Sequence, residues 1–165
     1  MQTAAQDPVF CAAFYAPYAA AAAACLNVLD SASKTMEPDV LSLSYRLKSG
    51  SSIRGKLLRK GLPQTAAAAC AALHDIAGLR VVLSSRAAIY RFANLLIAGG
   101  ALITEDVHDY IAAPKPSGYR SLHLIARISV PLHNQRCLIP VEIQLRTADM
   151  DAGARAEHKL IYKPR

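Results

Sequence analysis

Cations are concentrated in one stretch of the chain, which contains Arg46, Lys48, Arg54, Lys56, Arg59 and Lys60. No acidic residue lies between Asp39 and Asp75. On a strand Arg46 and Lys48 would project from one face, and on a helix Lys56 and Arg59 would share a side. A Gly/Ser turn at residues 49–52 would lead into the N-terminus of that helix, where free N–H groups favour an anion. The spacing predicts a triphosphate cradle. A solvated basic face is the alternative, and the GxxxxGK[ST] spacing of a Walker loop is absent.

Two carboxylates lie at the edges of predicted strands. Asp75 precedes the apolar run 79–83, and Glu142 lies between Val141 and Ile143. A residue flanked by two strand residues faces opposite to them, so Glu142 points either to solvent or into a cleft. Spacing alone favours solvent. If the two carboxylates meet across the sheet, they could hold Mg²⁺ against phosphates.

A stiff turn presents an aromatic ring between cations, in the sequence Pro-Lys-Pro-Ser-Gly-Tyr-Arg-Ser at residues 114–121. Tyr119 could stack on a nucleobase there. A simple turn with Tyr119 folded onto the core is the alternative, and the turn alone favours it. Cys70 and His74 lie one helical turn apart, but no second pair of ligands accompanies them, so we expect no zinc site.

The elements that must position these side chains alternate along the chain. The patterns predict helices at 18–33, 51–60, 64–73 and 85–98, and a last helix capped by Thr147 that carries Glu157 and His158. We expect the first helix to begin after Pro17. Strands are predicted at 41–47, 79–83, 103–110, 121–130 and 138–145. This mixture predicts an α/β or α+β fold with a mixed sheet.

Composition narrows the class of protein. The chain has 165 residues, 53% of them hydrophobic, which fits one globular domain and excludes a disordered tail. The formal net charge of +7 points to an anionic partner. We expect no membrane span, because no uninterrupted apolar run of about 18 residues is apparent. The four cysteines are far apart, which favours a reducing, cytoplasmic setting without disulfides.

Four motifs then combine in order: RLKSGSSIRGKLLRKG, DIAGLRVV, DYIAAPKPSGYRSLHL and VEIQLRTADMDAGARAEHKLIYK. Together they resemble the synthetase domain of RelA/SpoT-type alarmone synthetases, and most of all its small, single-domain members. The resemblance implies one synthetase domain over 1–165, with an alanine-rich helical segment at 1–40 and a catalytic core at 41–163. It also implies a nucleotidyltransferase-like mixed sheet flanked by helices.

The activity that the resemblance implies is Mg²⁺-dependent transfer of the β,γ-pyrophosphate of ATP to the 3′-hydroxyl of a purine nucleotide, with release of AMP. The product would be (p)ppGpp or an adenine analogue such as (p)ppApp. Carried over by motif, the ATP contacts are Arg46, Lys48, Ser52, Lys56, Arg59 and Arg80. The acceptor contacts are Lys115, Tyr119, His123, Gln144, Arg146 and Asp151. Asp75 and Glu142 would hold the metal and carry the chemistry, Glu142 as general base or hydroxyl-orienting group.

Two departures from the family pattern bear on function. Ala152 and Gly153 stand where bulky residues are usual, so an adenine acceptor is open beside the default guanine. The sequence ends just after the YK element, where self-standing members continue. This suggests a toxin or secreted-effector domain with an antitoxin or immunity partner.

Other functions stay open at this point. One is pyrophosphorylation of a tRNA 3′ end, which the net charge would suit. Another is an inactive RNA- or nucleotide-binding module, which the retained pair Asp75 and Glu142 disfavours. A purely structural interaction protein is the weakest alternative.

Overall fold

The computed structural model describes residues 9–161, and their side chains as far as Ala156. The order of elements is α1 (Ala12–Thr35), β1 (Val40–Leu47), α2 (Gly50–Arg59), α3 (Ala66–Ala72), β2 (Ala77–Leu83), α4 (Arg86–Ala98), β3 (Ile103–Asp109), β4 (Leu122–Leu132), β5 (Gln135–Thr147) and α5 (Ala148–Ile161). Each predicted helix and strand is present, with ends shifted by a few residues. The side chains of Glu157 and His158, predicted on the last helix, lie outside the described ones.

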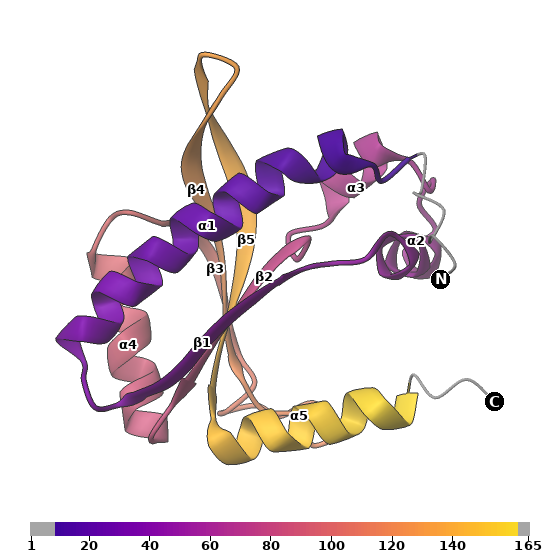
Figure 1. Ribbon diagram of the computed structural model, residues 1–165. Helices are drawn as coiled ribbons and strands as arrows, with labels where there is room; N and C mark the ends of the chain where they lie inside the picture. Colours follow the sequence, from indigo (N-terminus) through magenta and orange to yellow (C-terminus); the bar gives the residue numbers. More distant parts are fainter. Residues whose placement is uncertain (1–8, 162–165) are drawn as a thin grey trace, which may run out of the picture.

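The five strands form a mixed sheet in the order β1-β2-β5-β4-β3 (Figure 1). The central pair β2 and β5 is parallel, and the other neighbours are antiparallel. Beyond the sheet, β4 and β5 continue as a two-stranded hairpin that projects from the body of the molecule. The predicted mixed α/β architecture is confirmed.

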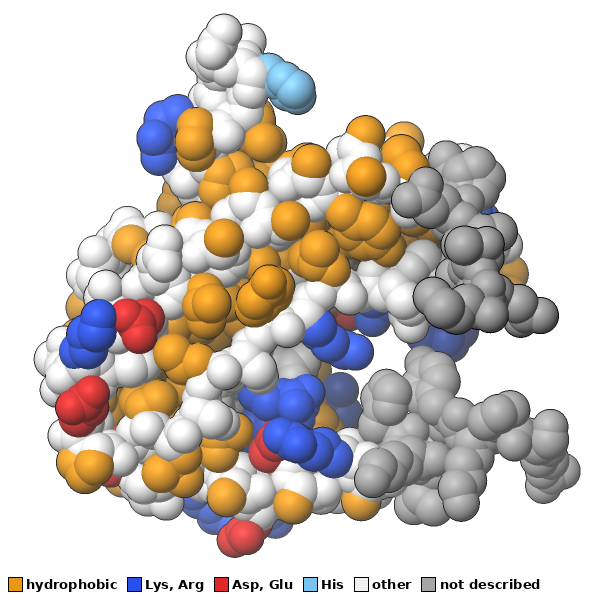
Figure 2. All heavy atoms as spheres, viewed as in Figure 1, with side chains coloured by type: hydrophobic (Ala, Val, Ile, Leu, Met, Phe, Trp, Pro, Cys, Tyr) orange, Lys and Arg blue, Asp and Glu red, His pale blue; other side chains and the backbone are white. Residues whose placement is uncertain are grey.

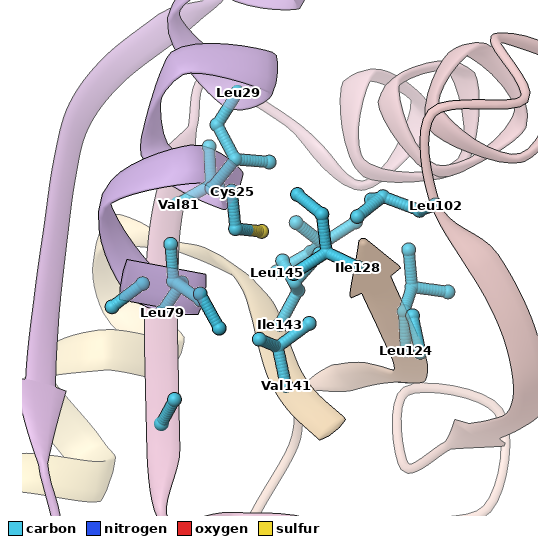
Figure 3. Close-up of a cluster of buried hydrophobic side chains, with 14 of the residues drawn as sticks. Cys25, Leu29, Leu79, Val81, Leu102, Leu124, Ile128, Val141, Ile143 and Leu145 are labelled. Atoms are coloured by element: carbon cyan, nitrogen blue, oxygen red, sulfur yellow. The ribbon is translucent and has the colours of Figure 1, made fainter. Parts of the chain in front are cut away.

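Alternation along the central strands separates a core face from a polar face. Leu79 and Val81 of β2, and Ile143 and Leu145 of β5, lie buried beneath Cys25 and other α1 residues (Figure 3). Each such buried aliphatic side chain contributes about 1.5–3 kcal/mol to folding. The residues between them point to the opposite face, which α5 partly covers. The site is built on that second face.

Helix α1 begins at Ala12 and contains Pro17, so the expected start after this proline is wrong. Phe14 and Tyr18 lie four apart on one side of the helix, with ring centres 5.5 Å apart. The ring of Phe10, just before the helix, has its centre 4.9 Å from that of Phe14. The hydroxyl of Tyr15 also donates a 2.7 Å hydrogen bond to the carbonyl of Lys48. These contacts favour helix in the turn before the proline, although Pro17 cannot donate to the carbonyl four residues earlier.

Helix α1 is also long and apolar enough to cross a membrane, by length and composition alone. The expectation of no such run is therefore wrong as a statement about sequence. In the structure its fully buried residues, Ala21, Ala22, Cys25 and Leu29, belong to the same core as the sheet. A helix that packs on a core can satisfy the same criterion.

Helix starts follow their expected chemistry. The side chains of Ser49, Thr65 and Ser85 accept hydrogen bonds from backbone N–H groups in the first turns of α2, α3 and α4. Gly61, just past α2, adopts a positive φ of 67°, which glycine allows without strain. All four cysteines are free, as predicted.

Replacing Pro17 with alanine tests the position of the helix start. Because Pro17 lies inside α1, Pro17→Ala restores a backbone donor, and we expect the free energy of unfolding to rise by about 1–3 kcal/mol. Urea unfolding followed by circular dichroism would measure it. If the helix instead began after residue 17, the variant would be no more stable than the parent.

Candidate active site

A cavity of about 960 Å³ opens on the polar face of the sheet. Figure 2 shows Lys and Arg side chains gathered in the hollow between β1 and α5. Most of the residues predicted for the site line this one cavity: Arg46, Lys56, Asp75, Arg80, Lys115, Tyr119, His123, Glu142, Gln144 and Arg146. A smaller cavity of about 150 Å³ between β1 and β2 shares five of these residues. Motifs that are far apart in the sequence thus meet on one surface.

Asp75 joins the basic stretch to the start of β2. Its Oδ2 accepts hydrogen bonds from the ammonium groups of Lys48, at 3.0 Å, and Lys56, at 2.8 Å. Burial alone would raise the pKa of this carboxyl, but the bond from Lys56 and the charges of both lysines outweigh it and hold the pKa below its usual range. Asp75 is therefore ionised at neutral pH.

The second oxygen of Asp75 is fitted for a metal ion. Oδ1 is buried and has no hydrogen-bond partner among the described residues. Glu142 lines the same cavity, and Mg²⁺ is commonly held by one or two carboxylates together with substrate phosphates. Between residues 9 and 156 no group of three His, Cys, Asp or Glu side chains forms an all-protein metal site. Asp75 and Glu142 thus fit the magnesium ion that the family resemblance implies.

Glu142 points into the cavity, so the solvent-facing orientation favoured by spacing alone is wrong. Its side chain is only 14% exposed. Gln144 donates a 2.5 Å hydrogen bond to Oε1, and Nδ1 of His123 lies 3.6 Å from the same oxygen. Neighbours on β4 and β5 therefore fix the orientation of this carboxylate.

Tyr119 lies half-buried at the cavity wall, rather than in the core as the turn alone favoured. Its hydroxyl accepts a 2.6 Å hydrogen bond from Nη2 of Arg146 and lies 2.8 Å from Nε2 of His123. The ammonium of Lys115 lies over the Tyr119 ring, 4.9 Å from its centre, and 4.4 Å from the centre of the Tyr110 ring. Two aromatic rings and two cations thus form one wall.

His123 is held neutral within this wall. Burial lowers the pKa of its imidazole to about 3, and the positive charges of Arg146 and Lys115 act in the same direction. Its ring therefore serves as a neutral hydrogen-bonding partner for Tyr119 at physiological pH.

Asp151 lies behind the wall, buried, and forms ion pairs with Arg80, Arg146 and Arg155. Burial lowers the pKa of Arg80, and the nearby charge of Arg146 lowers it further, while Asp151 opposes both effects. The first turn of α5 thus ties together arginines from two strands.

Comparison with known proteins identifies the family. A model of the region found in RelA/SpoT proteins matches residues 45–165. The chain belongs to the RelA/SpoT family. GTP pyrophosphokinase YwaC of Bacillus subtilis is 46% identical over 118 residues, which are 72% of this chain and 56% of that protein. This chain spans about half the length of the curated relatives it matches.

Solved structures of RelA/SpoT relatives share the fold. Small alarmone synthetase 1 from Bacillus subtilis, bound to its product pppGpp, matches with a TM-score of 0.82 and 32% identity over 91% of this chain and 78% of that one. A GTP pyrophosphokinase family protein from Streptococcus pneumoniae matches with a TM-score of 0.84 and 31% identity over 91% and 75%. The five-stranded sheet with its flanking helices is thus a small alarmone synthetase fold.

Four of the residues carried over from the RelA/SpoT motifs do not line the cavity: Lys48, Ser52, Arg59 and Asp151. Lys48 is bound to Asp75, and Asp151 lies behind the arginines. Ser52 lies in the first turn of α2, where its backbone N–H donates to Oγ of Ser49 and its own Oγ accepts a hydrogen bond from the Ser49 hydroxyl. Arg59 is exposed, and its guanidinium folds back along α2 toward Gly55, with Nη1 3.4 Å from the point where a side chain at residue 55 would begin. Lys60 lines the cavity instead, from the turn after α2.

Lys60 belongs to the basic stretch of the predicted cradle, but several other lining residues were not predicted: His74, Glu105, Asp106, His108, Tyr110 and Arg155. Tyr110 could have been found, because it ends a predicted strand inside the quoted DYIAAPKPSGYRSLHL motif. Arg155 follows Asp151 by four residues, the spacing of a helical ion pair. The acidic and histidine residues from β3 and the α3–β2 loop carry no spacing that marks them as part of a site.

The neutral state of His123 predicts a pH dependence of stability. In the unfolded chain His123 takes up a proton near pH 6.5, whereas the folded protein resists protonation down to about pH 3. The folded protein therefore gains nothing from a proton that the unfolded chain binds. Its free energy of unfolding is unaffected by His123 well above pH 6.5 and falls as the pH drops from there toward 3. We expect the folded protein to lose about 1 kcal/mol between pH 6.5 and 5.5 relative to His123→Gln. Urea unfolding of both proteins in EDTA would measure it, and parallel pH profiles would contradict the assignment.

Proposed function

We propose that this chain transfers the β,γ-pyrophosphate of ATP to the 3′-hydroxyl of a guanine nucleotide and releases AMP. One observation carries the proposal: a carboxylate pair, a cluster of cations and a stacking wall surround one cavity. The names of the relatives support a guanine acceptor, since YwaC is a GTP pyrophosphokinase and small alarmone synthetase 1 was crystallised with pppGpp.

The ATP side is the half of the cavity lined from β1, α2 and β2. Arg46, Lys56 and Lys60 face the cavity there, and Arg80 follows on β2. Phosphoryl transfer depends on positioning and on stabilising charge that spreads over phosphate oxygens, which these cations are placed to do. Lys48 and Lys56 are held by Asp75 and so are already fixed before ATP binds.

The carboxylates Asp75 and Glu142 would hold Mg²⁺, through Oδ1 of Asp75 and the Glu142 carboxylate. When bound, the ion offsets negative charge on the phosphates. Asp75 would keep its bonds to Lys48 and Lys56 through Oδ2 while Oδ1 held the ion.

The acceptor side is the wall built from Tyr119, Lys115, His123 and Gln144. The Tyr119 ring would stack on the purine, and Gln144 orients the Glu142 carboxylate. Glu142 would accept a hydrogen bond, and then the proton, from the 3′-hydroxyl. The 3′-oxygen forms a bond to the β-phosphorus of ATP, the bond between that phosphorus and the bridging α,β-oxygen breaks, and AMP leaves with that oxygen.

The decisive experiment is a product assay. Purified protein is incubated with ATP, Mg²⁺ and one acceptor per reaction: GDP, GTP, ADP, AMP or a tRNA pool. The products are identified by mass spectrometry. AMP release with a 3′-diphosphorylated guanine nucleotide supports the proposal. A 3′-diphosphorylated adenine nucleotide would show that the acceptor is an adenine nucleotide and would favour a toxic role through depletion of ATP. A modified tRNA end would show that the acceptor is RNA and not a free nucleotide. If folded protein releases no AMP with any acceptor, the proposal is overturned.

Loss of either carboxylate should abolish transfer. We expect Glu142→Gln and Asp75→Asn to lower kcat by at least about 100-fold, because each removes a proton acceptor or a metal ligand without changing side-chain size. Glu37→Gln, in the exposed turn before β1, is the matched control and should be unaffected. The assay is AMP release under saturating substrates, with circular dichroism to confirm folding. A carboxylate variant as active as the control would exclude that role.

Substitution of Tyr119 should separate stacking from hydrogen bonding. Tyr119→Ala removes the ring, and we expect KM for the acceptor to rise about 10- to 100-fold with little change in KM for ATP. Tyr119→Phe keeps the ring and loses only the bonds to His123 and Arg146, so its effect should be much smaller. Initial rates at varied acceptor concentration would measure both. Equal effects of the two variants would argue against stacking.

A further inference from the structure

The carboxylate of Asp151 is surrounded by arginines from three elements. Oδ1 lies 3.2 Å from Nη1 of Arg80 on β2 and 3.1 Å from Nη1 of Arg146 on β5. Oδ2 accepts a 2.7 Å hydrogen bond from Nε of Arg155, one turn further along α5, and Nη2 of the same arginine forms an ion pair with it at 2.7 Å. These contacts engage both oxygens with charged donors, the strongest class of hydrogen bond.

Asp151 itself does not line the cavity, whereas all three of its arginine partners do. The residue is only 5% exposed. Its arginines therefore lie between the carboxylate and any nucleotide in the cavity. A base edge would have to displace a buried ion pair to reach Asp151, and breaking such pairs is costly.

The arginines that Asp151 holds belong to both halves of the site. Arg146 continues toward the acceptor wall, where Nη2 donates hydrogen bonds to the hydroxyl of Tyr119, at 2.6 Å, and to Oε1 of Gln144, at 2.7 Å. Arg80 lies on β2, in the half that we assign to ATP, directly opposite Gln144 in the parallel pairing. The guanidinium groups of Arg80 and Arg146 both contact Oδ1 of Asp151, and without this shared anion they would repel each other.

We propose that Asp151 is a positioning residue, which orients Arg80 toward ATP and Arg146 toward the acceptor and does not recognise the acceptor base. This inference deepens the proposed function and rests on it. It changes the role that the motif resemblance implied for Asp151, that of an acceptor-binding residue. The chemistry that follows is distinctive: one carboxylate outside the cavity controls affinity for both substrates, and base selectivity comes from other groups.

Asp151→Asn separates the two roles, because asparagine has the same shape but cannot balance the arginine charges. We expect KM to rise about tenfold for ATP and about tenfold for GDP. The ratio of kcat/KM for GDP to that for ADP should stay within about threefold of the parent protein. Asp149→Asn, in the same helical turn but without an ion pair to any side chain described up to Ala156, is the matched control and should keep the parent's constants. An effect on the acceptor alone, or a tenfold change in the GDP-to-ADP ratio, would overturn the proposal.

A second variant keeps the inference testable if Asp151→Asn does not fold. Arg155→Met removes the most exposed of the three arginines and leaves Asp151 with Arg80 and Arg146. We expect a smaller rise, about two- to fivefold, in KM for both substrates, and partial recovery in Arg155→Lys. Unchanged constants in Arg155→Met, or a change for one substrate only, would contradict a shared anchor.

Binding measurements distinguish failure of this inference from failure of the proposed function. If the parent protein releases no AMP with any acceptor, the proposed function fails. Calorimetric titration with a non-hydrolysable ATP analogue then tests the anchor on the ATP side without any reaction. A loss of affinity of about tenfold in Asp151→Asn supports the anchor. Equal affinity in parent and variant overturns it, whatever the activity.

Discussion

The parallel pairing of β2 and β5 is the constraint on which the site depends. Its register sets Gly78 opposite Glu142, Arg80 opposite Gln144 and Val82 opposite Arg146. The intervening aliphatic residues of both strands are buried beneath α1. A slip of one residue would turn the polar side chains into the core and the aliphatic ones into the cavity. Apolar burial thus fixes the register, and the register fixes which charged groups can meet.

The polar face holds many cations close together. Two carboxylates share this task, each joining elements that are separate in sequence. Asp75 connects lysines at the end of β1 and in α2 to the start of β2, and Asp151 connects β2, β5 and α5. Buried carboxylates of this kind add little net stability, because the favourable Coulomb energy of each ion pair is largely cancelled by the free energy of desolvating its charges. Their contribution is orientation, since each paired cation is held in a fixed direction on this face.

Much of this could be predicted from sequence, and the rest has identifiable physical reasons. Alternation predicted the strands, and the motif resemblance predicted that Asp75, Glu142 and Tyr119 belong to one site, which agrees with the one cavity that they line. Spacing could not show that Glu142 faces the cavity, because alternation defines two faces without saying which is open. Nor could it show that Asp151 meets Arg80 and Arg146, since that depends on pairing strands some 60 residues apart in the chain. The predicted start of α1 after Pro17 was wrong for a related reason. Local propensity favoured a break at the proline, and aromatic packing outweighed that preference.

Helix α1 extends this logic to residues that precede the matched family region. That region begins at residue 45, yet fully buried residues of α1 complete the core that fixes the β2–β5 register. The helix also reaches the site itself, because the hydroxyl of Tyr15 holds the carbonyl of Lys48, whose ammonium binds Asp75. Ala21 and Ala22 are fully buried in this core. No residue of α1 lines the cavity, but this helix fixes the backbone from which Lys48 extends.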